Sequence, residues 1–386
     1  MVNESAEFFS KPLISLCMIV KNEAENLPRC LASAKPFVDE MIVVDTGSED
    51  NTVEIAKSWG AKVSNFQWCD DFSAARNYSL SLADGNWILV LDGDEELIVE
   101  SESWRQELAE TSEVNAYGLI RLEANVSHVI GGFHGRIFRN LPDLKYVNRF
   151  HEQLQFADKR NLKFGRLEGV KIIHYGNLES EKVMEKAARR NIPILEQMRS
   201  ESHLNFWLLD CLGRKYTLIG ENEKAAECYA EILDKLSPSL IDGNPPEDFF
   251  WIPTLLHFLG VKYFEEEDYE TARILCQRGL EWCPNYPPIN NLAGEIVKSL
   301  GFPLGAIAYF EKCLQLGQTG NYYIGEPFEL SFLTTYPAYN IGCTYWEMQH
   351  PQEALAALEM ALAFDANFTP AHDKIAEIKQ ALPSMI

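Results

Sequence analysis

The sequence predicts two domains: an α/β domain with a mostly parallel central sheet and, after it, an all-α domain of helical repeats. Apolar runs alternate with helical patterns over about the first 100 residues, and after about residue 180 only helical patterns remain. Small residues then recur at a fixed spacing, which is typical of repeated helix pairs. We expect the α/β domain over residues 1–180, a helical connector over 181–200 and the repeat domain over 201–386.

The α/β prediction depends on strands and helices that follow each other in turn. Three continuous apolar runs have the length and β-branched content of buried parallel strands: residues 13–20, 41–44 and 87–91. Helical patterns cover three further stretches: residues 25–35, 53–59 and 70–84. Ligands of such a sheet bind outside the carboxyl ends of its strands, and Asp45, Arg76, Asp92 and Asp94 all fall near that edge.

The run at residues 87–91 leads directly into four carboxylates that are divided by one glycine. Asp92 and Asp94 are two residues apart and can present oxygens to one hard divalent cation, while Gly93 lets the backbone come close. With a formal net charge of -23, the chain can bind an anionic nucleotide only where a metal or local arginines reverse the field. The alternative is a strand that ends in a solvated acidic turn.

Four ordered segments resemble the successive motifs of family 2 glycosyltransferases: residues 18–23, 43–52, 72–77 and 91–95. The resemblance covers roughly the first 100 residues closely, and their order and spacing both fit. It implies a GT-A fold, a nucleotide-activated sugar, usually a UDP-sugar, and inversion of the anomeric centre in a single displacement. Asp92 and Asp94 would be the DxD pair that binds Mg²⁺ or Mn²⁺.

The same resemblance implies roles around the nucleotide. Asp45 would bind the uracil edge, and Asn22 and Glu23 would flank the nucleoside. Arg76 would lie by the base or the diphosphate. Taken alone, Asp45 could equally be the N-cap of a helix, and Arg76 could be a charge on a helix surface.

An inverting transferase also needs a base, which deprotonates the acceptor on the face opposite the leaving group. Residues 131–139, 147–152 and 172–176 resemble the second half of a subgroup of family 2 enzymes, with an Arg-x-Phe-Arg segment, a His-Glu pair and a His-x-Gly segment. The resemblance implies Glu152 as the base, with His151 as its rival. Common family 2 enzymes carry an acidic pair where this chain has His-Glu, so both assignments stay open.

Three further residues belong to this second half. His174 would be a further metal ligand or a diphosphate contact. Arg136 and Arg139 either contact the diphosphate or the acceptor, or simply border the sheet. We expect the adjacent His-Glu pair to lie on a strand, where the two side chains point to opposite faces, so at most one can face the substrate without a bulge.

The second domain is predicted from its small residues. Residues 181–198 favour a helix that Pro193 should break or kink. Beyond it, glycine and alanine recur twelve residues apart in four places: Gly213 and Ala225, Gly260 and Ala272, Gly294 and Ala306, Gly342 and Ala354. This pattern resembles the tetratricopeptide repeat, with about four helix pairs and insertions near 237–251 and 317–337. The insertions either contact a partner or pack back onto the first domain.

Composition limits the classes of protein. No apolar run reaches the roughly 18 residues that a membrane helix needs, and the N-terminus lacks the pattern of a signal peptide. Nine cysteines without a CxxC pair indicate reduced core residues. We therefore expect a cytoplasmic protein without a membrane span. The acidic balance argues against nucleic acid and anionic membranes as partners.

Several functions fit this combination of domains, which resembles sublancin-type bacteriocin S-glycosyltransferases and lipopolysaccharide-core β-glucosyltransferases. A peptide or protein side chain (Cys, Ser or Thr) is the favoured acceptor, because helical repeats mostly bind polypeptide; a lipid-linked or cell-surface saccharide is the alternative. A non-catalytic scaffold with a degenerate transferase domain should have lost Asp45 or residues of the carboxylate cluster, but the sequence retains all of them. A nucleotidyltransferase should carry a glycine-rich phosphate loop after the first strand, which is absent here. The repeats could also form a homodimer.

Overall fold

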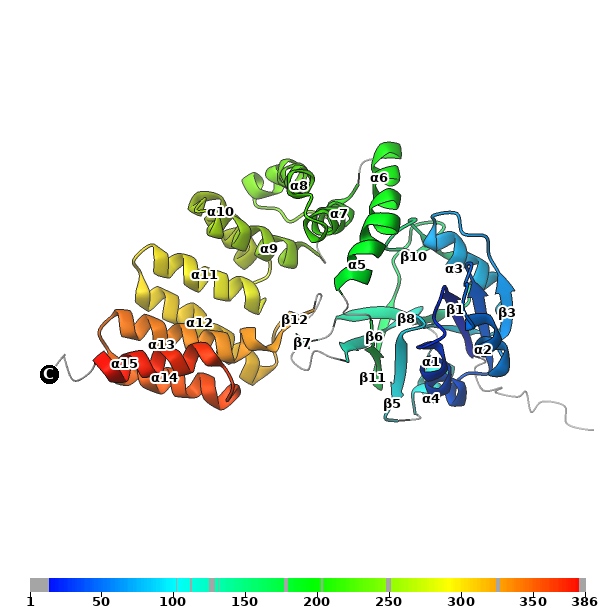
Figure 1. The fold of residues 1–386 in the computed structure, drawn as a ribbon, viewed down its shortest axis with the longest axis horizontal. Coiled ribbons are helices and arrows are strands. Elements are labelled where there is room, and N and C mark those ends of the chain that lie inside the picture. The colour runs from blue at the N-terminus through cyan, green and yellow to red at the C-terminus, as the bar shows by residue number, and fades with distance from the viewer. Residues whose placement is uncertain are drawn as a thin grey trace, which may run out of the picture. The chain divides into compact units, whose positions relative to one another are not determined.

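A computed structural model describes residues 14–381 apart from 102, 112, 125–128, 131, 177–179, 203, 248–250 and 324–326. The start of the chain, which was predicted to lack a signal peptide, lies outside the described residues. The predicted fold class is confirmed: an α/β region comes first and helical repeats follow (Figure 1).

The alternation of strands and helices is confirmed in the order in which it was predicted. The first elements are β1 Ile14–Val20, α1 Leu27–Ala34, β2 Glu40–Asp45, α2 Thr52–Ser58, β3 Lys62–Asn65, α3 Phe72–Ser81 and β4 Trp87–Val90. β3 was not predicted, because its four residues include only one strongly apolar side chain, Val63. α3 begins where Asp71 accepts a hydrogen bond from the backbone N–H of Ala74, which is an ordinary N-cap.

One eight-stranded sheet forms the centre of this region. Its remaining strands are β5 Glu95–Val99, β6 Ala116–Glu123, β8 Phe133–Arg139 and β11 Phe164–His174, and α4 Ser103–Glu110 lies between β5 and β6. The strand order is β3-β2-β1-β4-β8-β6-β11-β5. Four pairings are parallel and three, those of β8 with β4 and β6 and of β11 with β5, are antiparallel. β9 Leu144–Val147 and β10 Gln153–Phe156 pair as a separate hairpin.

Each face of the sheet packs its own core, as the alternation of side chains along a strand requires. Leu16 and Met18 of β1 pack with residues of α1, α2 and α4 on one face. Cys17, between them, packs on the other face with residues of α3 and of the β9–β10 hairpin. These two layers cover the faces of the sheet. The carboxyl ends of β1, β2 and β4 lie at its edge, where a ligand can bind.

Contacts between residues divide the chain into two compact units. The first contains residues 1–127 and 132–225, and the second contains residues 128–131 and 226–386. The α/β region, the connector and α7 Phe206–Leu218 thus form one unit. In the second unit, β7 Val129–Ile130 pairs antiparallel with β12 Phe328–Glu329.

The connector is helical, and Pro193 disturbs it without ending it. α5 Ser180–Lys186 continues into a π-helical turn, η2 Ala187–Asn191, and then into α6 Ile192–Glu201. Pro193 has no N–H to donate, and in an α-helix its ring would meet the carbonyl of residue 189. The wider π turn lies immediately before this position, where it accommodates the proline.

In the described residues, each glycine and its alanine fall on two successive helices. These are α7 and α8 Asn222–Asp242, α9 Ile252–Glu265 and α10 Tyr269–Trp282, α11 Pro287–Ser299 and α12 Pro303–Thr319, and α13 Thr335–Glu347 and α14 Pro351–Phe364. α15 Thr369–Ala381 is an additional helix. The predicted insertion near 237–251 is helical in its first part, since α8 continues to Asp242 with Pro238 inside it. The second predicted insertion contains β12 and the 3₁₀ helix η4 Leu330–Leu333; residues 248–250 and 324–326 lie outside the description.

The repeat glycines allow close packing of helices. A Cβ atom on Gly260 would lie 2.6 Å from Leu292, and one on Gly342 would lie 2.7 Å from Leu358. A Cβ atom on Gly294 would clash with the ring of Phe310, which is fully buried. Gly294 and Gly342 thus make room for the large apolar residues that follow the repeat alanines by four positions.

Replacing Gly294 with alanine should therefore destabilise the repeat unit. Alanine favours a helix over glycine by about 1 kcal/mol, but overpacking against a ring that cannot move costs about 1–3 kcal/mol, so we expect a net loss of about 1 kcal/mol. Urea denaturation followed by circular dichroism measures it. Ser299→Ala, on the exposed side of the same helix, is the control; equal stability of the two variants would contradict the packing argument.

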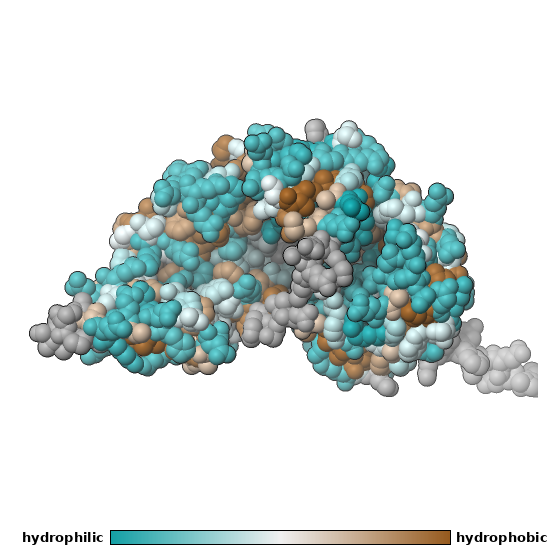
Figure 2. All heavy atoms as spheres, viewed as in Figure 1, coloured by the Kyte–Doolittle hydropathy of each residue, from teal (hydrophilic) through white to brown (hydrophobic). Residues whose placement is uncertain are grey.

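The surface and the cysteines agree with the composition. On the face shown in Figure 2, hydrophilic residues predominate and hydrophobic residues occur in small groups. All nine cysteines are free; seven of them are buried, as expected of core residues, whereas Cys69 is exposed and Cys343 is half-buried. Among the described residues, no helix combines the length and apolar character needed to cross a membrane.

Candidate functional site

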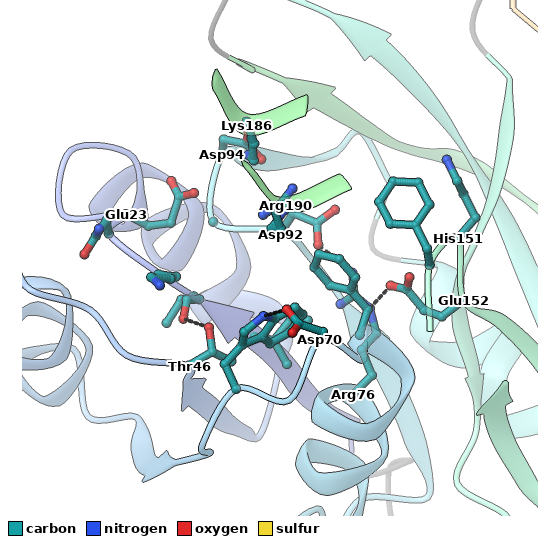
Figure 3. Close-up of a pocket in the computed structure, with 18 of the residues that line it drawn as sticks. Glu23, Thr46, Asp70, Arg76, Asp92, Asp94, His151, Glu152, Lys186 and Arg190 are labelled. Carbon is teal, nitrogen blue, oxygen red and sulfur yellow. Dashed lines mark hydrogen bonds and ion pairs between the residues drawn. The ribbon is translucent and has the colours of Figure 1, made fainter. Parts of the chain in front are cut away.

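A cavity of about 750 Å³ lies at the carboxyl edge of the parallel strands. Val20 and Asn22 at the end of β1, Thr46 after β2 and Asp92 after β4 all line it. The loop before β10 also lines the cavity, as do α5 and η2 of the connector (Figure 3). All of these residues belong to the first unit, so the cavity is built by one compact body.

Asp92 is held by two arginines. Arg76 Nη2 lies 2.7 Å from Asp92 Oδ1, and Arg136 Nη2 lies 2.9 Å from Asp92 Oδ2. Burial alone would raise the pKa of Asp92, but the two guanidinium groups outweigh burial and hold it well below its usual value. The carboxylate is therefore charged, and each of its oxygens already has a cationic partner.

Arg76 connects Asp92 to the predicted base. Its Nε donates to Glu152 Oε1 at 2.5 Å, and Figure 3 shows Glu152 directed towards it. Arg76 is 7% exposed and comes from α3, so a buried helix residue fixes both carboxylates in place. The prediction of Arg76 as a nucleotide contact is not tested, but the alternative of a surface charge is wrong.

Asp94 and His174 form the second cluster at the cavity. His174 Nε2 lies 3.3 Å from Asp94 Oδ2, and His174 Nδ1 lies 2.6 Å from Glu123 Oε2. Burial would lower the pKa of His174, but hydrogen bonds to the two carboxylates raise it to about 9. Burial would likewise raise the pKa of Asp94, and the hydrogen bond from His174 lowers it.

This cluster fits part of the donor set of a divalent cation. Glu123 Oε2 and Arg121 Nη2 both lie within hydrogen-bond distance of His174 Nδ1; with Nδ1 protonated, His174 donates to Glu123 and its Nε2 is oriented for a metal. Binding would displace the proton from Nε2. Among the described residues, no group of three or more histidine, cysteine, aspartate or glutamate side chains is already gathered for a metal ion, because Asp92 is turned to its arginines. The metal assignment of Asp92, Asp94 and His174 remains a prediction.

The residues predicted to flank the nucleoside lie at the ends of β1 and β2. Asn22 adopts a left-handed backbone conformation (φ 55°), and its side chain accepts the N–H of Glu49 in the loop after β2. Asn22 and Glu23 line the cavity, and burial raises the pKa of Glu23. A Cβ atom on Gly93 would lie 2.7 Å from the side chain of Glu23, so glycine makes room for Glu23; the approach of this backbone to a cation stays a prediction.

Asp45 is buried beside the cavity and is not among its lining residues; the neighbouring Thr46 is. The carboxylate of Asp45 accepts hydrogen bonds from the backbone N–H groups of Gly47 and Ser48. It therefore shapes its own loop, and the N-cap position of α2 belongs to Asn51. Contact of Asp45 with a uracil edge remains a prediction.

The His-Glu pair does not lie on a strand, so that expectation is wrong. β10 begins at Gln153, and His151 has a left-handed backbone (φ 51°), so both side chains can face the cavity. His151 Nε2 lies 3.1 Å from the thiol of Cys211, and its ring packs edge-on against Trp207. Although part of its surface is accessible, the surrounding protein lowers the pKa of His151 to about 4.

The two arginines of the Arg-x-Phe-Arg segment lie in different surroundings, and a contact of either with the diphosphate or the acceptor stays a prediction. Arg139 borders the sheet: its Nε donates to the carbonyl of Val114, and its guanidinium lies 4.5 Å from the ring centroid of Trp87. Arg136 bridges Asp92 and the fully buried Glu95, with 2.6 Å between Arg136 Nη2 and Glu95 Oε1. Arg136 thus fixes the position of the Asp92 carboxylate through an ion pair.

Replacing Arg136 with glutamine should lower the free energy of unfolding by about 3 kcal/mol, because it leaves the carboxylate of Glu95 buried with only Arg121, at 3.8 Å, as a cation. Urea denaturation measures the loss. The double variant Glu95→Gln/Arg136→Gln removes both charges and should recover part of it. A single variant as stable as the wild type would contradict the role given to Arg136.

Sequence reasoning missed the basic and aromatic walls of the cavity. Lys186, Arg189 and Arg190 line it from α5 and η2, and Trp68 and Phe72 line it near the start of α3. The basic run in an acidic chain was a visible signal, but nothing in the sequence placed the connector over the strand ends. The aromatic residues were hidden among ordinary core positions.

Comparison with known families agrees with this geometry. Residues 15–119 match the family described as glycosyl transferase family 2, and residues 338–368 match the tetratricopeptide repeat. The first match contains β1 to β4 and the carboxylate cluster, and the second contains most of α13 and α14. The chain thus carries a family 2 glycosyltransferase domain and a tetratricopeptide repeat.

The curated relatives are named as glycosyltransferases or as a tetratricopeptide repeat protein. A tetratricopeptide repeat-containing protein of Synechococcus elongatus is 50% identical over 139 residues, which are 36% of this chain and 34% of that protein. The SPbeta prophage-derived glycosyltransferase SunS of Bacillus subtilis is 30% identical over 226 residues, 56% of this chain and 52% of that protein. An uncharacterized glycosyltransferase of Rickettsia felis is 45% identical over 87 residues, 22% of this chain and 30% of that protein. The chain therefore matches between about a third and half of the length of these relatives.

Proposed function

We propose, from the family 2 glycosyltransferase domain and the cavity that it carries, that this chain transfers a sugar from a nucleotide-sugar, expected to be a UDP-sugar, to an acceptor with inversion at the anomeric carbon. The observation that carries the proposal is the Arg76 bridge. It holds Glu152 at the same cavity as Asp92 and Asp94, so a base and a candidate diphosphate site face one space.

Glu152 is the proposed base. Arg76 occupies its Oε1, and its Oε2 accepts no hydrogen bond from the described residues, so one oxygen is available to take a proton. As Glu152 removes the proton, the acceptor nucleophile forms a bond to the anomeric carbon. The bond from that carbon to the diphosphate oxygen breaks, and its electron pair leaves with the diphosphate. His151 is the less suitable base, because its Nε2 already contacts a thiol.

The other residues of the cavity would bind the metal and the nucleotide part of the donor. Asp94 and His174, with Glu123 behind them, would hold Mg²⁺ or Mn²⁺, which supplies stabilisation of the charge that develops on the diphosphate. Arg76 and Arg136 keep Asp92 ionised and in position. Asn22 and Glu23 would border the nucleoside. Asp45 would reach the uracil edge from the loop that it organises.

For the acceptor, we propose a peptide or protein side chain. The tetratricopeptide repeat supports this choice, since such arrays present surfaces for polypeptides. The free cysteines suit the reducing cytoplasm, where we place the reaction. A lipid-linked saccharide remains the second candidate, favoured by the resemblance of the His-Glu segment. Homodimer formation through the repeats is proposed on the sequence alone.

A panel of UDP-, GDP- and ADP-sugars tests the reaction class. Purified protein is incubated with each donor and Mn²⁺, and nucleotide release and the product anomer are followed by NMR. The proposal expects turnover of a UDP-sugar and, from an α-linked donor, a β-configured product. Retention of configuration would overturn the inverting mechanism, and turnover of another nucleotide-sugar would overturn the choice of donor.

A further inference from the structure

One wall of the cavity is basic and comes from the connector. Lys186, Arg189 and Arg190 are three and four residues apart, a spacing that puts side chains on one helix face, and all three line the cavity. Arg189 forms an ion pair with Glu185 at 3.0 Å. Lys186 and Arg190 form no ion pair with any residue that the structure describes. Two cations therefore face the cavity without a carboxylate partner.

Arg190 is the better anchored of the two. Its Nε donates to Asn191 Oδ1 at 3.0 Å, and its guanidinium carbon lies 5.0 Å from the ring centroid of Phe72. Within the described part of the chain, its two terminal nitrogens have no hydrogen-bond acceptor. Burial lowers the pKa of Arg190, and the Glu152 carboxylate opposes this shift without forming an ion pair with Arg190, so burial still disfavours the charge. Such an arrangement stabilises an anion that enters the cavity.

Lys186 lies near the acidic side of the same space. Burial raises the pKa of Glu23, Asp94 and Asp92 raise it further, and the Lys186 ammonium opposes this rise. Figure 3 shows Lys186 and Arg190 on the connector, with Asp94 and Asp92 beside them in that view. All four residues line the cavity, so a ligand there would meet both carboxylates and cations.

The position of these cations depends on the π turn. η2 inserts an extra residue into the helix just before Pro193, and such insertions occur frequently at functional sites. Arg190 lies within that turn and Lys186 directly before it. Both termini of η2 continue as helix, so the two cations are carried by regular backbone rather than by a loop.

We propose that Lys186 and Arg190 form an anion subsite that binds the diphosphate of the nucleotide donor. The inference rests on the proposed function, because it assigns the leaving group of that reaction to these two cations. A diphosphate carries several acceptor oxygens, which match one ammonium and the two free nitrogens of a guanidinium. The subsite would bind the donor and stabilise the charge that the departing diphosphate gains.

The test compares the double variant Lys186→Gln/Arg190→Gln with the wild type by calorimetric titration of UDP, uridine and inorganic pyrophosphate. We expect the variant to lose UDP and pyrophosphate affinity by about tenfold for each lost charge-assisted hydrogen bond, and uridine affinity to be unchanged. The control Lys57→Gln/Lys145→Gln removes the same charge from two exposed positions. Thermal unfolding confirms that both variants are folded.

The outcomes separate this inference from the proposed function. Wild-type UDP affinity in the double variant overturns the subsite as a donor site and leaves the transferase proposal intact, whether or not pyrophosphate binding is lost. A wild type that binds pyrophosphate through these residues but no UDP supports the anion subsite and overturns the UDP-sugar donor. A wild type that binds neither overturns both.

Discussion

Replacing Glu152 with glutamine should reduce sugar transfer by between about 10²- and 10⁴-fold, the range expected when a general base is lost. Glutamine has nearly the shape of glutamate, and its amide oxygen can still accept the hydrogen bond from Arg76 Nε. The variant should therefore keep its fold and its affinity for UDP. Initial rates of transfer and a UDP titration measure the two effects separately.

Two comparisons make the Glu152 result specific. Glu201→Gln removes the same charge from an exposed residue that pairs with Arg149, and it should transfer at the wild-type rate. His151→Gln tests the rival base, and we expect it to retain most of the activity. Wild-type transfer by Glu152→Gln, together with loss in His151→Gln, would move the base to His151.

Asp94→Ala should abolish the dependence of UDP binding on the metal. Asp94 is the only carboxylate within ion-pair distance of His174 Nε2 among the described residues, and alanine removes that oxygen ligand. Outer-shell partners of metals already contribute on the order of 10- to 100-fold in affinity, so a direct ligand should contribute at least as much. The measurement is UDP affinity with and without Mn²⁺.

The matched control for Asp94 is Asp84→Ala, which removes an exposed carboxylate that pairs with Lys62. It should bind UDP as the wild type does, with the same metal dependence. His174→Ala should resemble Asp94→Ala if both side chains contact the metal. Metal-dependent UDP binding of wild-type strength in Asp94→Ala would remove Asp94 from the proposed metal site.

The strands and their polar ends could be predicted because their signal is local. The apolar runs of β1, β2 and β4 and the residues that follow them are contiguous in sequence, and a parallel sheet brings their carboxyl ends together. β3 was not predicted, because its sequence is short and polar. The repeat helices were predictable since glycine and alanine recur at a fixed spacing, and Gly294 and Gly342 each face the large side chain four positions after the repeat alanine.

The contacts that complete the site could not be predicted from local pattern. Arg76 reaches Glu152, 76 residues away, and the sequence does not show that one guanidinium holds both Glu152 and Asp92. His151 has a left-handed backbone, so the side chains of His151 and Glu152 do not alternate as they would on a strand, and the prediction made from that alternation did not apply. Lys186 and Arg190 face the cavity only because the connector packs there, which is a tertiary effect.

Calorimetric titration of UDP into the wild-type protein, first with Mn²⁺ or Mg²⁺ and then with EDTA, tests the central claim most directly. The account predicts micromolar binding that weakens when EDTA removes the metal, because Asp94 and His174 would hold the cation at the diphosphate. No binding of UDP under either condition would contradict the assignment of the cavity as the donor site.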